Sequence, residues 1–180
     1  MTNISKKNIT PKNIAFTAMF AALCCVSTFI AVPLPIGYFN LGDVFVLVSA
    51  WALGPVFGAI AAGVGTALAD ILMSYVVYAP ATFIIKAAVA VTAALLFKSF
   101  KKSDATQKIY LFPRIISAIA GEAIMVCGYF IYEAFVLGYG MGALASVTGN
   151  CLQAASGVIG GTLLISALFS SRALKEIFRS

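Results

Sequence analysis

The residues of this chain that could do chemistry are a few ionisable and amide side chains set inside apolar stretches. Asp70, Lys86 and Glu133 each lie four or five residues inside the expected outer end of a helix, and Asn150 and Gln153 lie in the first turns of another. At a rise of ~1.5 Å per residue, all five share one depth, roughly 6–8 Å below the outer surface. An ionisable group in hydrocarbon costs at least ~2–3 kcal/mol, so each one normally has a partner, a water-filled cavity or a ligand.

Helical periodicity predicts that these side chains face a common space. Glu122, Tyr129 and Glu133 share one face of segment 114–137, and the two amides share one face of segment 146–169. Amides and carboxylates suit the edges of a small planar ligand, and aromatic rings suit its faces. The candidate substrate-binding residues are Lys86, Glu133, Asn150, Gln153, Tyr129, Asp70, Asn40, Tyr78 and Glu122.

Each of these residues also has a purely structural interpretation. Lys86 and Asp70 would neutralise one another between adjacent helices, and Glu133 would extend to the outer interface. Glu122, which lies deeper, would be a proton-relay carboxylate or a protonated packing residue. Tyr129 would be an interfacial aromatic residue, and the two amides would bond helix to helix.

The sequence indicates no catalytic or metal site. It contains no histidine, so Ser-His and Cys-His pairs are excluded. Its four cysteines, Cys24, Cys25, Cys127 and Cys151, lie in apolar contexts without metal-ligand spacing. No phosphate-binding Gly-x-x-x-x-Gly-Lys-Ser/Thr sequence is present. We therefore expect no enzyme activity, no cofactor and no metal.

Composition places the chain in the membrane. Of its 180 residues, 62% are hydrophobic and 10% are charged, and its mean hydropathy is +1.02. A soluble domain is nearer half apolar and a quarter charged. We predict an all-α membrane protein with one integral domain, 1–180, whose six transmembrane helices form one compact bundle. The expected spans are about 14–32, 41–53, 56–75, 81–97, 114–137 and 146–169.

Basic residues predict the orientation. They form three clusters, which are Lys6, Lys7 and Lys12; Lys98, Lys101, Lys102, Lys108 and Arg114; and Arg172, Lys175 and Arg179. Because basic residues that flank spans stay on the cytoplasmic side, both termini and the central loop are expected in the cytoplasm. The clusters account for almost all of the +6 net charge, so we expect no nucleic-acid partner.

Several short motifs in the span region resemble a known family. They are Ala18-Met-Phe-Ala-Ala22, Asn40-Leu-Gly-Asp43, Leu53-Gly-Pro-Val-Phe-Gly58, Gly65-Thr-Ala-Leu-Ala-Asp70, Tyr78-Ala-Pro-Ala-Thr82 and Lys86. Together they resemble the substrate-binding S component of energy-coupling factor (ECF) vitamin transporters. The similarity is greatest to the branch associated with pyridoxine or hydroxymethylpyrimidine uptake.

The resemblance implies a multi-pass protein of a prokaryotic plasma membrane that binds a vitamin near the outer face, beneath the first, third and fifth loops. It implies two kinds of partner, a membrane scaffold (T) subunit and two ATPase subunits. Ala18 and Ala22 would form part of the scaffold contact, although packing within the chain is an alternative. On binding its scaffold, the S component would topple and carry the ligand inward.

We therefore expect a subunit that captures a small heteroaromatic vitamin or precursor, of the pyridoxine or hydroxymethylpyrimidine type, for an ATP-driven importer. An S component for riboflavin or another ring compound is one alternative. A self-contained proton-coupled carrier that titrates Glu122 is another. An intramembrane enzyme or a structural subunit is the third.

Overall fold

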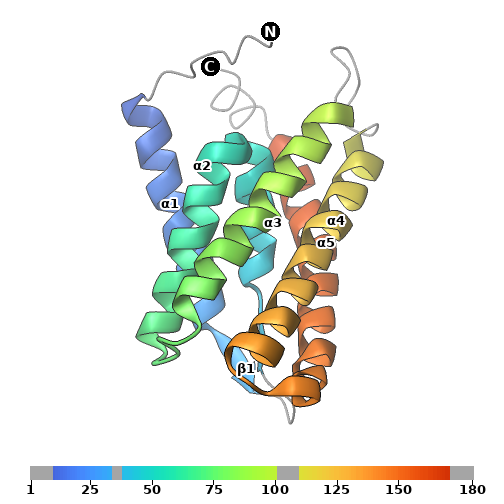
Figure 1. Cartoon of the computed structure of the whole chain (residues 1–180). Coiled ribbons are helices and arrows are strands. Elements are labelled where there is room, and N and C mark those ends of the chain that lie inside the picture. Colours follow the sequence, from blue (N-terminus) through green and yellow to red (C-terminus); the bar gives the residue numbers. More distant parts are fainter. Residues whose placement is uncertain (1–9, 34–37, 101–109, 171–180) are drawn as a thin grey trace, which may run out of the picture.

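The computed structural model describes residues 10–33, 38–100 and 110–170, and these ranges are almost entirely helical. The long helices are α1 (Pro11–Phe29), α2 (Gly42–Leu72), α3 (Ala79–Phe100), α4 (Leu111–Ile131) and α5 (Leu144–Ser170). Short elements connect them: strands β1 (Ala31–Pro33) and β2 (Tyr38–Asn40), a π-helical turn η2 (Tyr132–Val136) and a 3-10 turn η3 (Gly140–Ala143). The helices lie side by side as one bundle (Figure 1).

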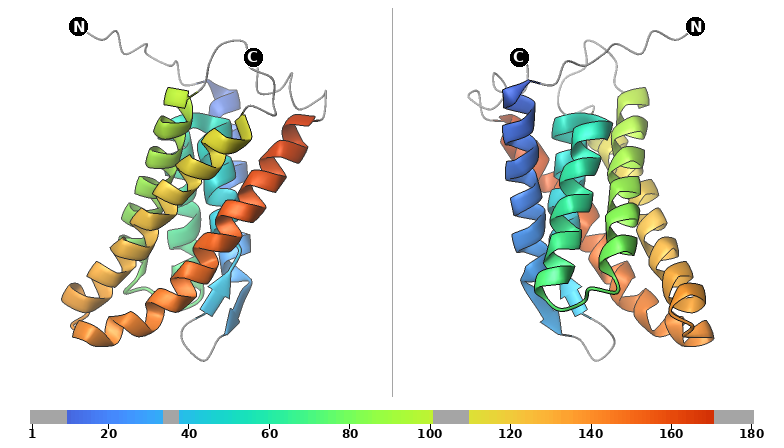
Figure 2. Two further views of the ribbon diagram at one scale, coloured as in Figure 1. Left: turned by 90° about the vertical axis from the view of Figure 1, so that its right-hand side faces the viewer. Right: turned by 60° about the vertical axis from the view of Figure 1, so that its left-hand side comes forward.

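Small residues let the helices approach closely. A Cβ atom at Gly65 would lie 2.3 Å from the backbone oxygen of Ala21, so α1 and α2 touch through their backbones. A Cβ atom at Gly63 would lie 2.9 Å from the backbone oxygen of Phe83, which places α3 equally close to α2. Such contacts are typical of helix packing in lipid, where van der Waals contact replaces the hydrophobic effect. Both views in Figure 2 show the resulting row of neighbouring helices.

Helix α2 folds back on itself at Gly54. Gly54 has a φ of 81°, in the left-handed region that favours glycine, and Pro55 starts the next helical segment. The Ser49 hydroxyl donates to the backbone oxygen of Gly58 at 3.3 Å, although nine residues of straight helix would separate the two by ~13 Å. The helix therefore consists of a short arm, 42–53, and a long arm, 55–72, that run antiparallel.

The helical membrane architecture is confirmed, but six separate spans are not. In the described part of the chain, five helices are long and apolar enough to cross a membrane. The expected spans 41–53 and 56–75 correspond to the two arms of α2, and the 12-residue short arm is only ~18 Å long, less than a hydrocarbon core.

The first helix also differs from the prediction, because it begins at Pro11 and ends at Phe29. The Thr10 side chain caps it by accepting from the backbone N–H of Asn13. The residues expected to complete this span form β1 instead, and Ala31 pairs with Asn40 of β2. This hairpin brings Asn40 and the start of α2 against the bundle.

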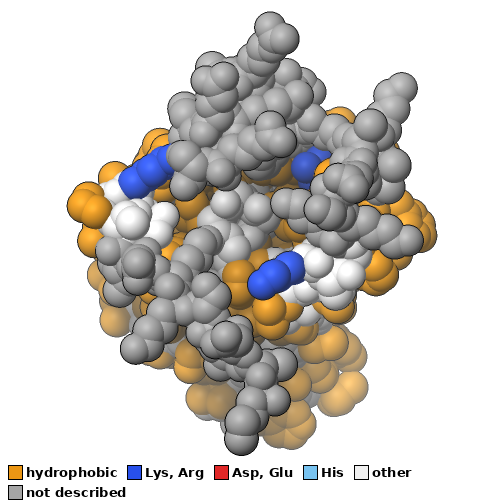
Figure 3. Space-filling view, turned by 90° about the horizontal axis from the view of Figure 1, so that it is seen from above, with side chains coloured by type: hydrophobic (Ala, Val, Ile, Leu, Met, Phe, Trp, Pro, Cys, Tyr) orange, Lys and Arg blue, Asp and Glu red, His pale blue; other side chains and the backbone are white. Residues whose placement is uncertain are grey.

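The bundle has two chemically different ends. The start of α1, the end of α3, the start of α4 and the end of α5 lie together at one of them, which we call the basic end (Figure 1). Lys and Arg side chains lie at this end, seen from above in Figure 3, and apolar side chains cover the flanks. Lys12, Lys98 and Arg114 are the cluster members that the structure describes there, and the other members lie outside the described residues. The hairpin, segment 73–78 and η3 form the opposite end, the loop end.

Candidate ligand-binding cavity

A cavity of about 580 Å³ opens toward the loop end of the bundle. All five long helices and the hairpin contribute to its wall. From the first half of the chain, the predicted residues in this wall are Asn40, Asp70, Tyr78 and Lys86. From the second half, they are Tyr129, Glu133, Asn150 and Gln153. The structure thus brings eight of the nine predicted residues to one space, and only Glu122 is absent from the lining.

Lys86 forms a buried ion pair, but with a different residue from the one considered above. Its Nζ lies 2.6 Å from Oδ1 of Asp43, and the two side chains are 4% and 0% exposed. Asp43 lies in the first turn of α2, where the positive end of the helix dipole favours a carboxylate. The interpretation that Lys86 neutralises Asp70 is therefore wrong. From the sequence, Asp43 was named only as part of the Asn40-Leu-Gly-Asp43 motif.

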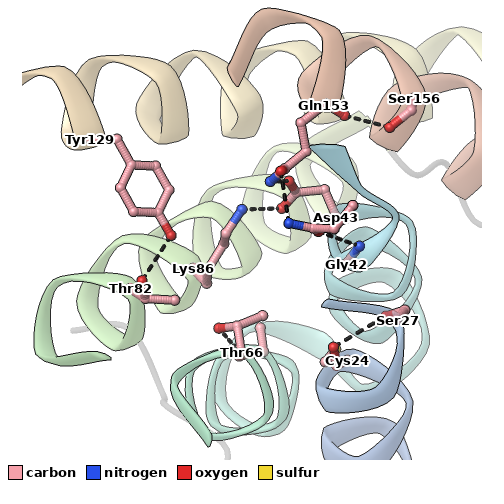
Figure 4. Close-up of polar contacts among 12 residues, drawn as sticks. Cys24, Ser27, Gly42, Asp43, Thr66, Thr82, Lys86, Tyr129, Gln153 and Ser156 are labelled. Atoms are coloured by element: carbon pink, nitrogen blue, oxygen red, sulfur yellow. Dashed lines mark hydrogen bonds and ion pairs between the residues drawn. The ribbon is translucent and has the colours of Figure 1, made fainter. Parts of the chain in front are cut away.

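An amide relay fixes the other side of Asp43 (Figure 4). The Gln153 amide donates to Asp43 Oδ2 at 2.5 Å, and the Asn40 amide donates to Gln153 Oε1 at 2.9 Å. The backbone N–H of Gly42 in turn donates to Asn40 Oδ1 at 2.8 Å. A Cβ atom at Gly42 would lie 2.2 Å from the Thr28 hydroxyl, so this approach requires glycine. The relay joins the hairpin, α2 and α5 at the base of the cavity.

Tyr129 covers the other side of the Lys86 ammonium group. The ammonium nitrogen lies 5.5 Å from the centroid of the Tyr129 ring, within the range of a cation–π contact. The Tyr129 hydroxyl donates to Oγ1 of Thr82, one turn before Lys86 on α3, at 3.0 Å. An ammonium group has three N–H donors, and Asp43 accepts from it once. Lys86 is therefore held in place with donors left for a ligand.

Glu133 ties together the segments at the mouth of the cavity. Its Oε1 accepts from the Tyr78 hydroxyl at 3.4 Å, and its Oε2 accepts from the Ser146 hydroxyl. Burial and then the nearby Glu133 carboxylate raise the pKa of Tyr78, so this phenol stays a neutral donor at physiological pH. Glu133 lies in η2, and single π-helical turns of this kind are frequent at functional sites. The carboxylate thus links segment 73–78 to the start of α5.

Two buried atoms of the cavity wall have no hydrogen-bond partner among the described residues. They are Oδ2 of Asp70, whose residue is 2% exposed, and Oγ1 of Thr28. Buried polar atoms are nearly always paired in folded proteins. Both residues belong to the cavity wall, so their unpaired atoms are candidates for contact with a bound molecule.

Glu122 lies behind the base of the cavity. Neither of its carboxylate oxygens has a partner among the described residues, and the residue is buried. A Cβ atom at Gly157 would lie 2.8 Å from Cβ of Asp43 and 2.9 Å from Oε1 of Glu122. Gly157 therefore makes room for two neighbouring carboxyl side chains. This position fits the expectation that Glu122 lies deeper than the polar layer.

Sequence reasoning missed several residues of the site. Asp43 and Ser146 hold predicted residues in place, and Thr28, Thr66 and Tyr139 belong to the wall. The signal for Asp43 was its position at the start of a helix in the Asn40-Leu-Gly-Asp43 motif. The hydroxyl residues gave no signal, because serine and threonine are common in membrane helices.

The remaining predicted side chains lie away from the cavity. Ala18 and Ala22 are exposed on one face of α1, so neither packs inside the chain. Cys24 and Cys25 are buried and free, and Cys127 and Cys151 are exposed and free. Among the described residues, no group of three or more His, Cys, Asp or Glu side chains could hold a metal.

Comparisons with known proteins agree with this architecture. The family model described as "ECF-type riboflavin transporter, S component" matches residues 8–170. An uncharacterised protein of Pyrococcus woesei is 33% identical over 142 residues, which cover 78% of this chain and 89% of the relative. A solved S component of a bacterial ECF transporter superposes with a TM-score of 0.69 at 24% identity, over 88% of this chain and 96% of that one, which establishes the fold. The chain therefore belongs to the family of ECF transporter S components, multi-pass membrane subunits that bind a small vitamin ligand and work with scaffold and ATPase subunits.

Proposed function

We propose that this S component captures a single-ring heteroaromatic vitamin or precursor, of the pyridoxine or hydroxymethylpyrimidine type, from outside a prokaryotic plasma membrane. The observation that carries the proposal is the common cavity of Lys86, Glu133, Asn150 and Gln153. Its volume falls within the ~300–1,000 Å³ of small-molecule pockets. Each predicted contact would reach one small molecule from a different side.

The chemistry of the wall supports a ligand with polar edges. Among the described residues, the wall has hydroxyl, amide, carboxylate and ammonium groups, and its aliphatic side chains are no larger than alanine. Tyr75, Tyr78, Tyr129 and Tyr139 supply aromatic surfaces. A small ring that carries hydroxyl, hydroxymethyl or amino groups suits this wall. The dimethylbenzene edge of a flavin would find fewer apolar neighbours there.

The charges of the wall support a ligand without a carboxylate. The Lys86 ammonium is balanced by Asp43, which leaves Asp70 and Glu133 as acidic groups of the wall. A carboxylate ligand would meet like charges there, which is unfavourable at low dielectric. Neutral or weakly basic rings, such as pyridines and aminopyrimidines, avoid this repulsion.

Riboflavin is a second candidate, and the family description favours it. The cavity volume of about 580 Å³ does not restrict the ligand to a single ring. Binding of riboflavin but not of single rings would therefore preserve the capture function while changing its substrate.

For transport, the captured ligand would be released through the partner subunits. Ala18 and Ala22 lie exposed, one turn apart in the middle of α1, and would form a flat contact for the scaffold. The basic end would face the cytoplasm, where two ATPase subunits supply the energy. Release inward then requires a state of the complex that binds the ligand more weakly.

The test is calorimetry and native mass spectrometry on the gently purified protein. We expect sub-micromolar binding of pyridoxine or hydroxymethylpyrimidine, and none of biotin, which carries a carboxylate. Millimolar affinity for every vitamin tested would contradict capture. Uptake by vesicles that hold this chain alone, driven by a pH gradient, would instead support the self-contained carrier.

A further inference from the structure

Asp70 is the acidic residue of the cavity wall whose bonding is incomplete. It lies on the long arm of α2, it is 2% exposed, and its Oδ2 atom has no partner among the described residues. A buried carboxylate oxygen can accept more than one hydrogen bond and is costly when it accepts none. Asp70 also lines the cavity, which has room for a molecule that carries such a donor.

The other carboxylates near the cavity either have hydrogen-bond partners on both oxygens or lie outside the cavity lining. Both oxygens of Glu133 accept from hydroxyl groups of the wall. Both oxygens of Asp43 are taken by Lys86 and Gln153, and Asp43 does not line the cavity. Glu122 is also outside the lining. Among the described carboxylates, Asp70 is therefore the one with an oxygen available to a ligand.

Lys86 presents the complementary chemistry in the same cavity. Its ammonium group is fixed by Asp43 and by the Tyr129 ring, and it keeps N–H donors beyond the bond to Asp43. The wall thus offers a fixed donor and an unpaired acceptor oxygen. A molecule that satisfies both must carry an acceptor and an N–H or O–H donor.

We propose that Asp70 selects the ligand by accepting a hydrogen bond from one of its N–H or O–H groups, while Lys86 donates to a ring nitrogen or oxygen. The substrate class is then a heteroaromatic ring with a hydroxyl, hydroxymethyl or amino donor. Asp43 is a positioning residue that holds Lys86 and does not touch the ligand. This inference rests on the proposed function of the cavity.

Calorimetry with matched ligand pairs tests the role of Asp70. Each parent is compared with an analogue that lacks donors. Pyridoxine is compared with 4-deoxypyridoxine, which lacks one hydroxyl group, and hydroxymethylpyrimidine with the analogue that has hydrogen in place of the amino group. Riboflavin is compared with lumiflavin, which lacks all hydroxyl groups of the ribityl chain. A hydrogen bond to a charged group corresponds to about 10- to 100-fold in affinity, and we expect this loss for one analogue of the parent that binds. In Asp70→Ala, parent and analogue should bind within about threefold of each other, because the acceptor is gone.

Two further variants keep the test decisive. Asp70→Asn keeps the size of the side chain and should reduce, without abolishing, the difference in affinity between parent and analogue. It therefore decides the question if Asp70→Ala does not fold. Ser27→Ala removes a hydroxyl of α1 that lies outside the cavity lining and donates to the backbone oxygen of Leu23. It should affect parent and analogue equally and leave their ratio unchanged.

The outcomes separate this inference from the proposed function. If a parent vitamin binds and the folded Asp70 variants keep the full preference over every analogue, the role of Asp70 is wrong and the capture function stands. If folded wild-type protein binds none of the three parents, the capture function fails, and this inference fails with it.

Discussion

Lys86 and Asp43 form a direct ion pair across the interface between α3 and the start of α2, with 2.6 Å between Nζ and Oδ1. Both side chains are almost fully buried, so each charge depends mainly on the other for compensation. A buried pair of this kind contributes little net stability, but removing one partner leaves an uncompensated charge. The pair therefore fixes the position of the Lys86 ammonium group at the cavity.

Replacing Asp43 by asparagine should destabilise the folded protein strongly. Asp43→Asn keeps the shape of the side chain but leaves a buried ammonium group without its counter-charge, and we expect a loss of about 3–5 kcal/mol. Thermal unfolding in detergent measures the change. The double variant Asp43→Asn/Lys86→Met removes both charges and should recover part of the stability without recovering ligand binding.

Ser27→Ala is the control for this measurement. The Ser27 hydroxyl donates to the backbone oxygen of Leu23 within α1, so its loss should stay within about 0.5 kcal/mol. A melting temperature of Asp43→Asn equal to that of wild type would show that the ion pair has no structural role.

Removing the hydroxyl groups that bind Glu133 should speed the release of ligand. Tyr78→Phe and Ser146→Ala each remove one bond that ties Glu133 to segment 73–78 or to the start of α5. A well-formed bond to a charged group contributes about 1.5–3 kcal/mol, so we expect Ser146→Ala to accelerate dissociation about 10-fold or more while association changes little. Tyr78→Phe should accelerate dissociation less, because its bond is long at 3.4 Å. Stopped-flow fluorescence measures both rates.

Tyr110→Phe is a matched control at the basic end, where the Tyr110 ring packs against Phe97 at 5.9 Å between centroids. Its dissociation rate should equal that of wild type. Unchanged dissociation in both Glu133-linked variants would mean that the mouth of the cavity does not limit release.

The meeting of these polar residues was predictable from the sequence because the helical rise and periodicity are fixed. Lys86, Glu133 and Gln153 lie on different helices, yet counting residues from the helix ends placed them at one level, and the structure brings them to one cavity. The role of Asp43 was not predictable, because it depends on two long-range features. These are the reversal of α2 at Gly54 and the pairing of Ala31 with Asn40.

Other features of the fold could not be predicted from the sequence for local reasons. The proline after Gly54 signalled the end of a segment. It did not show that the two arms of α2 would fold against each other, or that the short arm, 42–53, would be too short to span the membrane. The π-helical turn at Tyr132–Val136 was hidden too, because its wider hydrogen bonding leaves no clear mark on the apolar pattern.

Gly157→Ala should damage the base of the cavity. Its added Cβ atom would lie under 3 Å from the Asp43 and Glu122 side chains, and both are buried. We expect a loss of about 1–3 kcal/mol, as is typical of overpacking, and weaker ligand binding because Asp43 positions Lys86. Gly142→Ala is the stability control, because a Cβ atom there meets nothing within 4 Å. Equal melting temperatures of the two variants would contradict this account of the Asp43–Glu122 contact.

Enlarging the exposed alanines of α1 should separate ligand capture from transport. Ala18 and Ala22 face outward and lie far from the cavity wall, so Ala18→Leu/Ala22→Leu should keep vitamin affinity within about twofold. The added side chains would fill the flat surface proposed to meet the scaffold, and overpacking of a close helix contact costs about 1–3 kcal/mol per site. Co-purification with the scaffold and ATPase subunits should fall at least about 10-fold.

Ala123→Leu makes the same change on the exposed face of α4 and should leave complex formation intact. A double variant that assembles and transports as wild type does would move the scaffold contact to another face of the bundle.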